Sequence, residues 1–357
     1  MKKNLFWVAF ACVALASCVN ESENLLEENK GQRLTFGAPV MYNQSRTVVG
    51  EIDGTNYPDG ESFTVFGIEH EGRFVDWATN VITNDEGKGF FPAAGEVVTK
   101  GTDRYWYTTK DYYLPTEPNR YLSFAAYSPS SATANGTFTY GAAGLTITDW
   151  RMPDTDMYDL MYSTQATDVK TDVVNIAFLH ALSSIHIKFA MAATDGPSSV
   201  VVTNVAIKGE GIKNKGTFKD NITTEKEGTA AAWTGLTATA DIPTEYAILN
   251  SEYNVTTTAT EPTASVDFLP IPQKLENQTL LISYEIKMEG DTDYQVVENL
   301  EIPFKEFKVA DVVETTEWER AKRYFYTVTF GGLTKIKFSP SVEGWEDVTD
   351  AGTYIIK

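Results

Sequence analysis

Cysteine is nearly absent from this sequence. The 357 residues include two cysteines, Cys12 and Cys18, and both lie close to the N-terminus. Neither a disulfide framework nor a cysteine metal site can be built from them, because the sequence around them, taken up below, predicts that Cys12 is removed and Cys18 is modified.

Histidine is equally scarce, with three residues, His70, His180 and His186. His180 and His186 stand six positions apart, which is not the spacing at which one face of a helix presents two zinc ligands. We therefore expect structural roles for these side chains. The sequence also lacks a Gly-rich phosphate loop leading into a helix and a Gly-x-Ser-x-Gly motif. No catalytic residues, cofactor or metal are predicted, and an enzyme is not expected.

Acidic residues are plentiful, yet they form no convincing site. Two close pairs, Glu317/Glu319 and Asp154/Asp156, offer the two carboxylates of an acid–base mechanism. Asp291 and Asp293, beside Gly290, offer oxygen ligands for calcium, but a hairpin turn explains this stretch equally well. Solvated surface charge is the better interpretation of the carboxylate pairs in so acidic a chain.

Basic residues are too few for a nucleic-acid partner. The chain carries 29 Lys and Arg against 49 Asp and Glu, with a formal net charge of −20. Because binding to phosphates requires a basic surface, nucleic acid is excluded as an expected partner. Single cores stop growing near about 250–300 residues, so the length predicts two domains.

The longest apolar run at the N-terminus is too short to span a bilayer. Lys2 and Lys3 precede an apolar stretch from Leu5 to Leu15, which is followed by Leu15-Ala16-Ser17-Cys18. Small residues before a cysteine in this setting resemble the lipobox of bacterial lipoproteins. Residues 1–17 are therefore expected to be a signal peptide, with a thioether-linked lipid on Cys18; an ordinary secretory signal is the alternative. Residues 18–33 are polar and acidic and predict a solvated tether.

Short alternating segments dominate the rest of the chain and predict an all-β fold. Glycine, proline, asparagine and aspartate punctuate them at the spacing typical of β-sandwiches. The polar stretch 166–172 suggests a boundary, giving an N-terminal sandwich over residues 34–168 and a C-terminal one over 169–357. Trp318 to Lys322 is the one stretch expected to form a helical turn.

The first predicted strand is the centre of the functional argument. Its apolar residues share one parity, so all should lie on one face, and a polar turn containing Arg46 follows. A cut after Arg46 would leave this strand held by sheet contacts alone, and a strand from another molecule could then replace it. A cut after Arg33, which precedes the strand, would leave the groove filled. The residues predicted to occupy the groove are Leu34, Phe36, Ala38, Val40 and Tyr42.

The C-terminus offers a candidate donor strand. Ile336 to Val342 alternates strictly and predicts the last strand of the second sandwich. Beyond it, residues 348–357 form a poorer strand with an apolar tip that has no evident role on a free tail. As a donor this segment would place Val348, Tyr354 and Ile356 in a neighbour's groove. The alternative is that it pairs with its own sheet.

A cluster of aromatic residues supports a competing interpretation. Tyr105-Trp106-Tyr107 and Tyr112-Tyr113 lie close together in the sequence. Stacked against sugars, they would make the platform of a surface glycan-binding lipoprotein. As core residues of one hairpin they need no ligand, because aromatic residues are favoured in strands.

Taken in order, these features resemble the fimbrillin family, the lipoprotein-derived type V pilins of Gram-negative gut and oral bacteria. The resemblance spans nearly the whole mature chain. It comprises the lipobox, Ser45-Arg46-Thr47, the strand from Phe63 to Gly67, Asp159-Leu160-Met161-Tyr162, Phe178-Leu179-His180-Ala181-Leu182-Ser183, Tyr324-Phe325-Tyr326-Thr327-Val328, and Ile336-Lys337-Phe338-Ser339 before Gly344-Trp345.

The resemblance implies two tandem transthyretin-like β-sandwiches of about seven strands each. It also implies export to the outer membrane on a lipid anchor, followed by removal of the first strand by an arginine-specific protease, with Arg46 as the expected site. The emptied groove would then accept the C-terminal strand of another pilin subunit, in a head-to-tail homo- or heteropolymer that mediates adhesion. An unprocessed anchor or tip protein is the alternative within the family.

Overall fold

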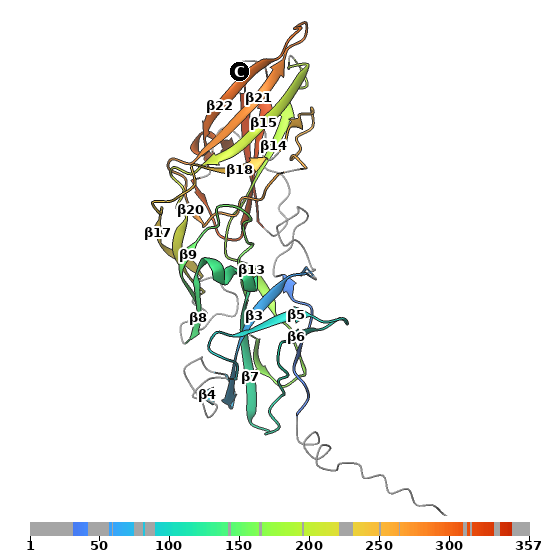
Figure 1. Cartoon of the computed structure of the whole chain (residues 1–357), viewed down its shortest axis with the longest axis vertical. Coiled ribbons are helices and arrows are strands. Elements are labelled where there is room, and N and C mark those ends of the chain that lie inside the picture. Colours follow the sequence, from blue (N-terminus) through green and yellow to red (C-terminus); the bar gives the residue numbers. More distant parts are fainter. Residues whose placement is uncertain are drawn as a thin grey trace, which may run out of the picture.

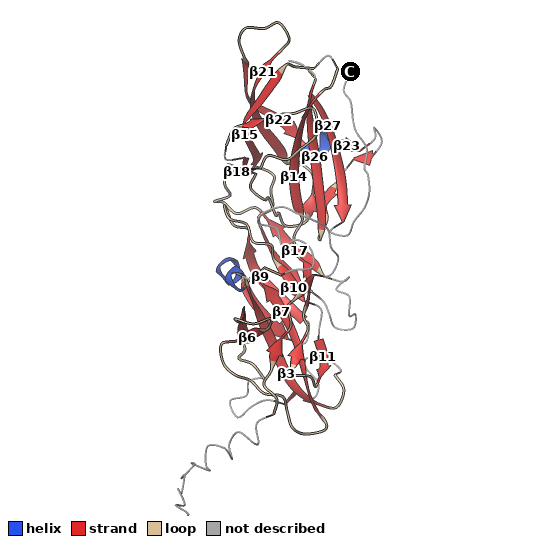
Figure 2. Ribbon diagram, turned by 90° about the vertical axis from the view of Figure 1, so that its right-hand side faces the viewer, coloured by secondary structure: helices blue, strands red, loops and turns tan. Residues whose placement is uncertain are grey.

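The protein, described from a computed structural model, is elongated, with the N-terminal strands at one end and the C-terminal strands at the other (Figure 1). Nearly all of its regular structure is β-strand, which confirms the predicted all-β class (Figure 2). The structure describes residues 31–41, 57–58, 60–74, 81–82, 90–141, 144–163, 166–194, 196–220, 231–249, 251–263, 265–309, 313–314, 316–331 and 336–344.

The largest sheet belongs to the N-terminal region. Its two long strands, β3 (Ser62–Glu71) and β7 (Arg120–Ser128), pair antiparallel at its centre. The shorter strands of this sheet are β1 (Thr35–Phe36), β2 (Val40–Met41), β4 (Val81–Ile82), β5 (Glu96–Lys100), β6 (Trp106–Thr108), β10 (Met161–Ser163), β11 (Ala166–Val169), β12 (Val173–Val174) and β13 (Ala177–His180).

The central strand β3 is buried on both faces, as its sequence predicts. Phe63 and Val65 point into one hydrophobic core, whereas Phe66 and Ile68 point into another. Successive side chains of a strand face opposite sides, so two adjacent cores require apolar residues on both faces of the strand.

The strands of this sheet close into a ring. The pairing order runs β12-β1-β6-β5-β3-β7-β10-β13-β2. Strands β12 and β13 are consecutive pieces of one segment, as are β1 and β2, and the two segments run parallel to each other. The N-terminal segment 35–41 therefore fills the place between β6 and the segment 173–180, and the core inside the ring contains Phe36, Phe63 and Phe178.

A second sheet covers the outer face of β3 and β7. It is assembled from two hairpins that are distant in sequence, β8 (Thr137–Gly141) with β9 (Gly144–Arg151), and β16 (Lys215–Lys219) with β17 (Ala232–Thr237). Ile147, Trp150 and Phe218 from this sheet pack with Phe66 and Tyr127 from the first. The two sheets thus share a core between their facing surfaces.

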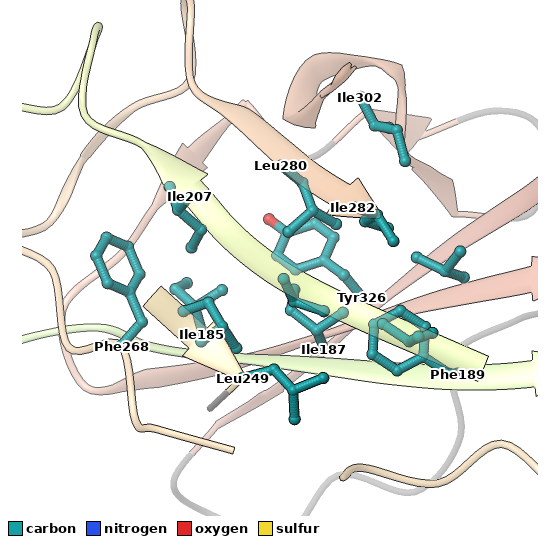
Figure 3. Packing of buried hydrophobic residues seen from close by; sticks show 14 of the residues in the cluster. Ile185, Ile187, Phe189, Ile207, Leu249, Phe268, Leu280, Ile282, Ile302 and Tyr326 are labelled. Atoms are coloured by element: carbon teal, nitrogen blue, oxygen red, sulfur yellow. The ribbon is translucent and has the colours of Figure 1, made fainter. Parts of the chain in front are cut away.

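The C-terminal strands form a separate sandwich. One sheet contains β14 (Ser184–Met191), β26 (Lys322–Phe330) and β27 (Ile336–Gly344). The facing sheet contains β15 (Ser199–Lys208), β18 (Glu245–Leu249), β19 (Tyr253–Asn254), β21 (Thr279–Lys287) and β22 (Gln295–Pro303). Figure 3 shows Ile185, Ile187 and Phe189 of β14 directed toward Leu280 and Ile282 of β21.

Short elements complete the described part of the chain. They are the pairs β20 (Gln273–Lys274) with β25 (Glu317–Trp318) and β23 (Lys308–Val309) with β24 (Val313–Glu314), and the 3-10 helices η1 (Ser130–Asn135) and η2 (Phe304–Glu306). The helical turn predicted over Trp318 to Lys322 was wrong, because Trp318 ends β25 and Lys322 begins β26. Among the described residues, no helix has the length and apolar character needed to cross a membrane.

The strand pairings do not follow the predicted division after Asp168. Segment 173–180 belongs to the N-terminal ring, and β16 of the second half pairs with β9 of the first. The division of the chain into domains stays a prediction. The pairings show that the two halves of the sequence share two sheets, the ring and the sheet of β8, β9, β16 and β17.

Candidate strand-exchange site

The N-terminal segment has paired neighbours on both sides. On one side, the Leu34 amide donates to the Tyr112 carbonyl at 2.8 Å, and the Leu114 amide donates to the Gln32 carbonyl at 2.9 Å. On the other side, the amides of Thr35 and Gly37 donate to carbonyls of segment 172–174 at 2.7 and 2.9 Å. The segment is therefore an interior strand of the ring rather than an edge strand.

Two side chains anchor this segment in the core. Leu34 is 2% exposed and Phe36 is 0% exposed. The Phe36 ring meets the rings of Phe63 and Phe124 edge-on, each at a centroid distance of 5.9 Å. Such edge-to-face geometry is favourable for aromatic pairs, so Phe36 contributes both buried area and oriented ring contacts.

The predicted alternation breaks after Phe36. Thr35 is opposite Val173 and Val40 is opposite Ala177, so the N-terminal segment has one residue more than its partner between these pairs. An extra residue in one strand reverses the parity of the side chains that follow. Accordingly Ala38 is exposed and Pro39 is buried, so the expectation that Ala38 faces the groove was wrong.

Arg33 precedes the anchors and is also paired. It forms an antiparallel bridge with Tyr113, and its guanidinium lies 2.6 Å from the Asp111 carboxylate. The same guanidinium lies over the Tyr107 ring, 4.7 Å from its centroid. The Arg33 and Asp111 side chains are 46% and 51% exposed, so this ion pair contributes at most about 1 kcal/mol.

Several predicted site residues lie outside the described part of the chain. They are Cys18, Tyr42 and Arg46, predicted for lipidation, the groove and processing, and the predicted donor residues Val348, Tyr354 and Ile356. For Val40 the structure describes the backbone, which pairs with Ala177 in β2. The predicted last strand is present as β27, antiparallel to β26 from Ile336 to Gly344.

Residues 53–345 match the sequence profile of the fimbrillin-like family. The chain belongs to this family.

Solved structures share the fold of this fimbrillin-like chain. A fimbrial protein from Bacteroides vulgatus matches with a TM-score of 0.57 and 18% identity, covering 88% of this chain and 99% of its own. A candidate cell adhesion protein from Bacteroides uniformis matches with a TM-score of 0.50 and 16% identity, again covering 88% of this chain and 99% of its own. The comparison with curated proteins gives no match.

The aromatic cluster of this fimbrillin-like protein is divided between core and surface. Trp106 is 1% exposed and packs against Tyr57 and Phe63. Tyr112 packs on Phe91, and its hydroxyl donates to the Glu96 carboxylate at 2.6 Å. Trp106 and Tyr112 therefore contribute to the core, whereas Tyr105, Tyr107 and Tyr113 remain partly exposed.

The three histidines lie in separate hydrogen-bonded environments. His180 Nδ1 lies 2.8 Å from the buried carboxylate of Asp159. His186 bonds to Ser184 and Glu261. This separation is consistent with structural roles.

His70 is buried against its own sheet. Its Nε2 bonds to Ser123 Oγ at 2.9 Å and its Nδ1 to the Gly72 carbonyl at 3.0 Å. Burial lowers the pKa of His70 below its usual value of 6.5, because the charged imidazolium is poorly solvated there.

Two of the candidate acidic residues have partners in the surrounding structure. Asp154 pairs with Arg151. Asp291 accepts a hydrogen bond from the Met288 amide in the turn between β21 and β22. Within the described ranges, no group of three or more His, Cys, Asp or Glu residues is arranged to hold a metal ion.

Sequence reasoning did not find the partners of the N-terminal segment. They lie around Tyr112 on one side and Val174 on the other, and no local pattern links either stretch to Phe36. Gly37 and Pro39, on either side of Ala38, were the local signal for the bulge, since both residue types interrupt regular strands.

Proposed function

We propose that this fimbrillin-like protein is a structural subunit of an adhesive fimbria, assembled by strand exchange at the groove of residues 34–41. The supporting observation is the position of this segment, paired on both sides in a ring that it closes. The segment lies at the start of the described residues, so one cut on its C-terminal side separates it from the described strands that follow.

Loss of the segment would open the ring along its length. The carbonyls of Tyr112, Asp172 and Val174 would lose their amide donors, and the pockets of Leu34 and Phe36 would open. Burying a large apolar side chain stabilises by about 1.5–3 kcal/mol, so these two anchors account for roughly 3–6 kcal/mol. A strand supplied by another subunit regains both the hydrogen bonds and the burial.

The donor in this proposal is the C-terminal segment 348–357 of a second subunit, which would place Val348, Tyr354 and Ile356 in the groove. A donor at one end of the chain and an acceptor at the other make a heterologous contact, which extends into a filament instead of closing into a dimer. Pairing of the segment with its own sheet would instead fit a tip or anchor protein.

Export and maturation follow from the same proposal. The lipid on Cys18 would hold the precursor at the outer membrane, and an arginine-specific protease would cut after Arg46, placing the mature subunit on the cell surface. The protein would act through assembly and adhesion, without catalysis. Surface glycan binding has no supporting observation in the aromatic cluster.

Replacement of the processing arginine tests the proposal. Arg46→Ala should leave the protein monomeric and attached to lipid, because the first strand stays in its groove. Arg33→Ala is the matched control and should assemble as the parent protein does. Normal filaments from Arg46→Ala would overturn the proposal.

A further inference from the structure

We infer that, while the N-terminal segment occupies its groove, the fold prevents arginine-specific proteases from cutting after Arg33. The segment is therefore released uncut. The inference rests on the proposed function, and it concerns the choice between the two arginines that flank the segment. Arg33 is the N-terminal one, and the structure describes it fully.

The backbone around the Arg33–Leu34 bond is already engaged. The Leu34 amide is bonded to Tyr112, and the Gln32 carbonyl accepts from Leu114, with Arg33 bridged to Tyr113 between them. A protease that takes its substrate as an extended strand must make its own hydrogen bonds to the same backbone edge. Cleavage here therefore requires residues 32–34 to leave the sheet first.

The side chains on both sides of the bond are held as well. The Arg33 guanidinium lies against Asp111 and over the Tyr107 ring. The hydroxyl of Tyr107 donates to Asp103 at 2.8 Å, which fixes the ring on which the guanidinium rests. Leu34, on the other side of the bond, is 2% exposed. Leu34 cannot enter a protease subsite without local opening, and the half-exposed Arg33 side chain must first leave its contacts with Asp111 and Tyr107.

Gly31 makes this pairing possible. A Cβ atom at this position would lie 2.1 Å from the carbonyl oxygen of Leu114, a backbone atom that a side-chain rotation cannot move. Any larger residue must push residues 31–34 away from 112–114. Gly60 offers a matched control, because a Cβ there meets nothing within 4 Å.

Two consequences follow for the order of events. While the segment is in the groove, cleavage can proceed only on its C-terminal side. Once the segment has left, Arg33 lies in a free peptide and becomes cleavable. Cleavage after Arg33 therefore reports that residues 32–34 have left the sheet.

The test measures cleavage after Arg33 by an arginine-specific endoproteinase on the full chain carrying Arg46→Ala. Mass spectrometry identifies the peptide that ends at Arg33. In this background, Gly31→Ala should raise the cleavage rate by about tenfold, the factor that corresponds to 1.4 kcal/mol, while Gly60→Ala should leave it unchanged. Asp111→Asn removes an ion pair between partly exposed side chains, so it should raise the cleavage rate by less than about fivefold.

The result that overturns the inference is cleavage of the folded parent as fast as that of the chain unfolded in denaturant. Equal rates for Gly31→Ala and Gly60→Ala would overturn it too. If Gly31→Ala does not fold, the comparison of the folded parent with the chain unfolded in denaturant decides: much slower cleavage of the folded parent supports the inference, and equal rates overturn it. Because the rate is measured on the purified chain, it is independent of whether filaments form, so its failure and the failure of the proposed function are distinguishable.

Discussion

The anchor Phe36 should control how tightly the N-terminal segment is held. Its ring is fully buried and contacts Phe63 and Phe124. Phe→Ala in a core costs about 3–5 kcal/mol, from lost transfer energy and the cavity that remains. Phe36→Ala should therefore lower the free energy of opening the segment by about that amount.

Hydrogen exchange measures this opening directly. The amides of Leu34, Thr35 and Gly37 are all bonded across the segment's two edges and should exchange only when it leaves the sheet. Since 1.4 kcal/mol corresponds to a factor of ten, Phe36→Ala should speed their exchange by about a hundredfold or more. Ala38→Ser is the control, because its exposed side chain should change stability by less than about 0.5 kcal/mol. Exchange rates within about threefold of the parent in Phe36→Ala would refute this account of the anchor.

Three further predictions concern other parts of the chain. His180→Leu should destabilise the protein by about 1–3 kcal/mol in urea unfolding, because it removes a hydrogen-bond donor from the buried Asp159 carboxylate. His180→Gln should destabilise it less, and equal losses in the two variants would show that this hydrogen bond does not contribute to stability. Because the pKa of His70 is lowered in the folded protein, the unfolded chain binds the proton more readily, and the free energy of unfolding should fall as the pH drops below about 6.5. His70→Gln should reduce this pH dependence in unfolding curves measured across the same range. Deleting residues 348–357 should leave β26 and β27 paired and the protein able to accept a donor, but unable to extend a filament; unfolding, or unchanged polymerisation in electron micrographs, would contradict the donor role.

The sequence was sufficient to predict which faces of the central strands are buried. Phe63, Val65, Phe66 and Ile68 are apolar at positions of both parities, and the structure places a core on each side of them. This information is local, since the direction of a side chain depends only on its position along the strand.

The partners of each strand could not be predicted in this way. Phe36 lies beside Val174, which is far along the chain, and neither of the two local sequence patterns predicts this pairing. The pairing of Phe218 with Ile147, across the predicted domain boundary, is non-local in the same sense. The N-terminal segment has one extra residue between Phe36 and Val40. Because an extra residue reverses the face to which the following side chains point, Ala38 lies on the exposed face.

The identity of the first residue of the protein on intact cells tests the central claim most directly. The subunit should be isolated from assembled surface material and sequenced from its N-terminus. If the groove is emptied by cleavage after Arg46, the sequence begins at Thr47. An assembled protein that begins at a lipid-modified Cys18 would retain the strand from Leu34 to Tyr42 and would contradict strand exchange at this groove.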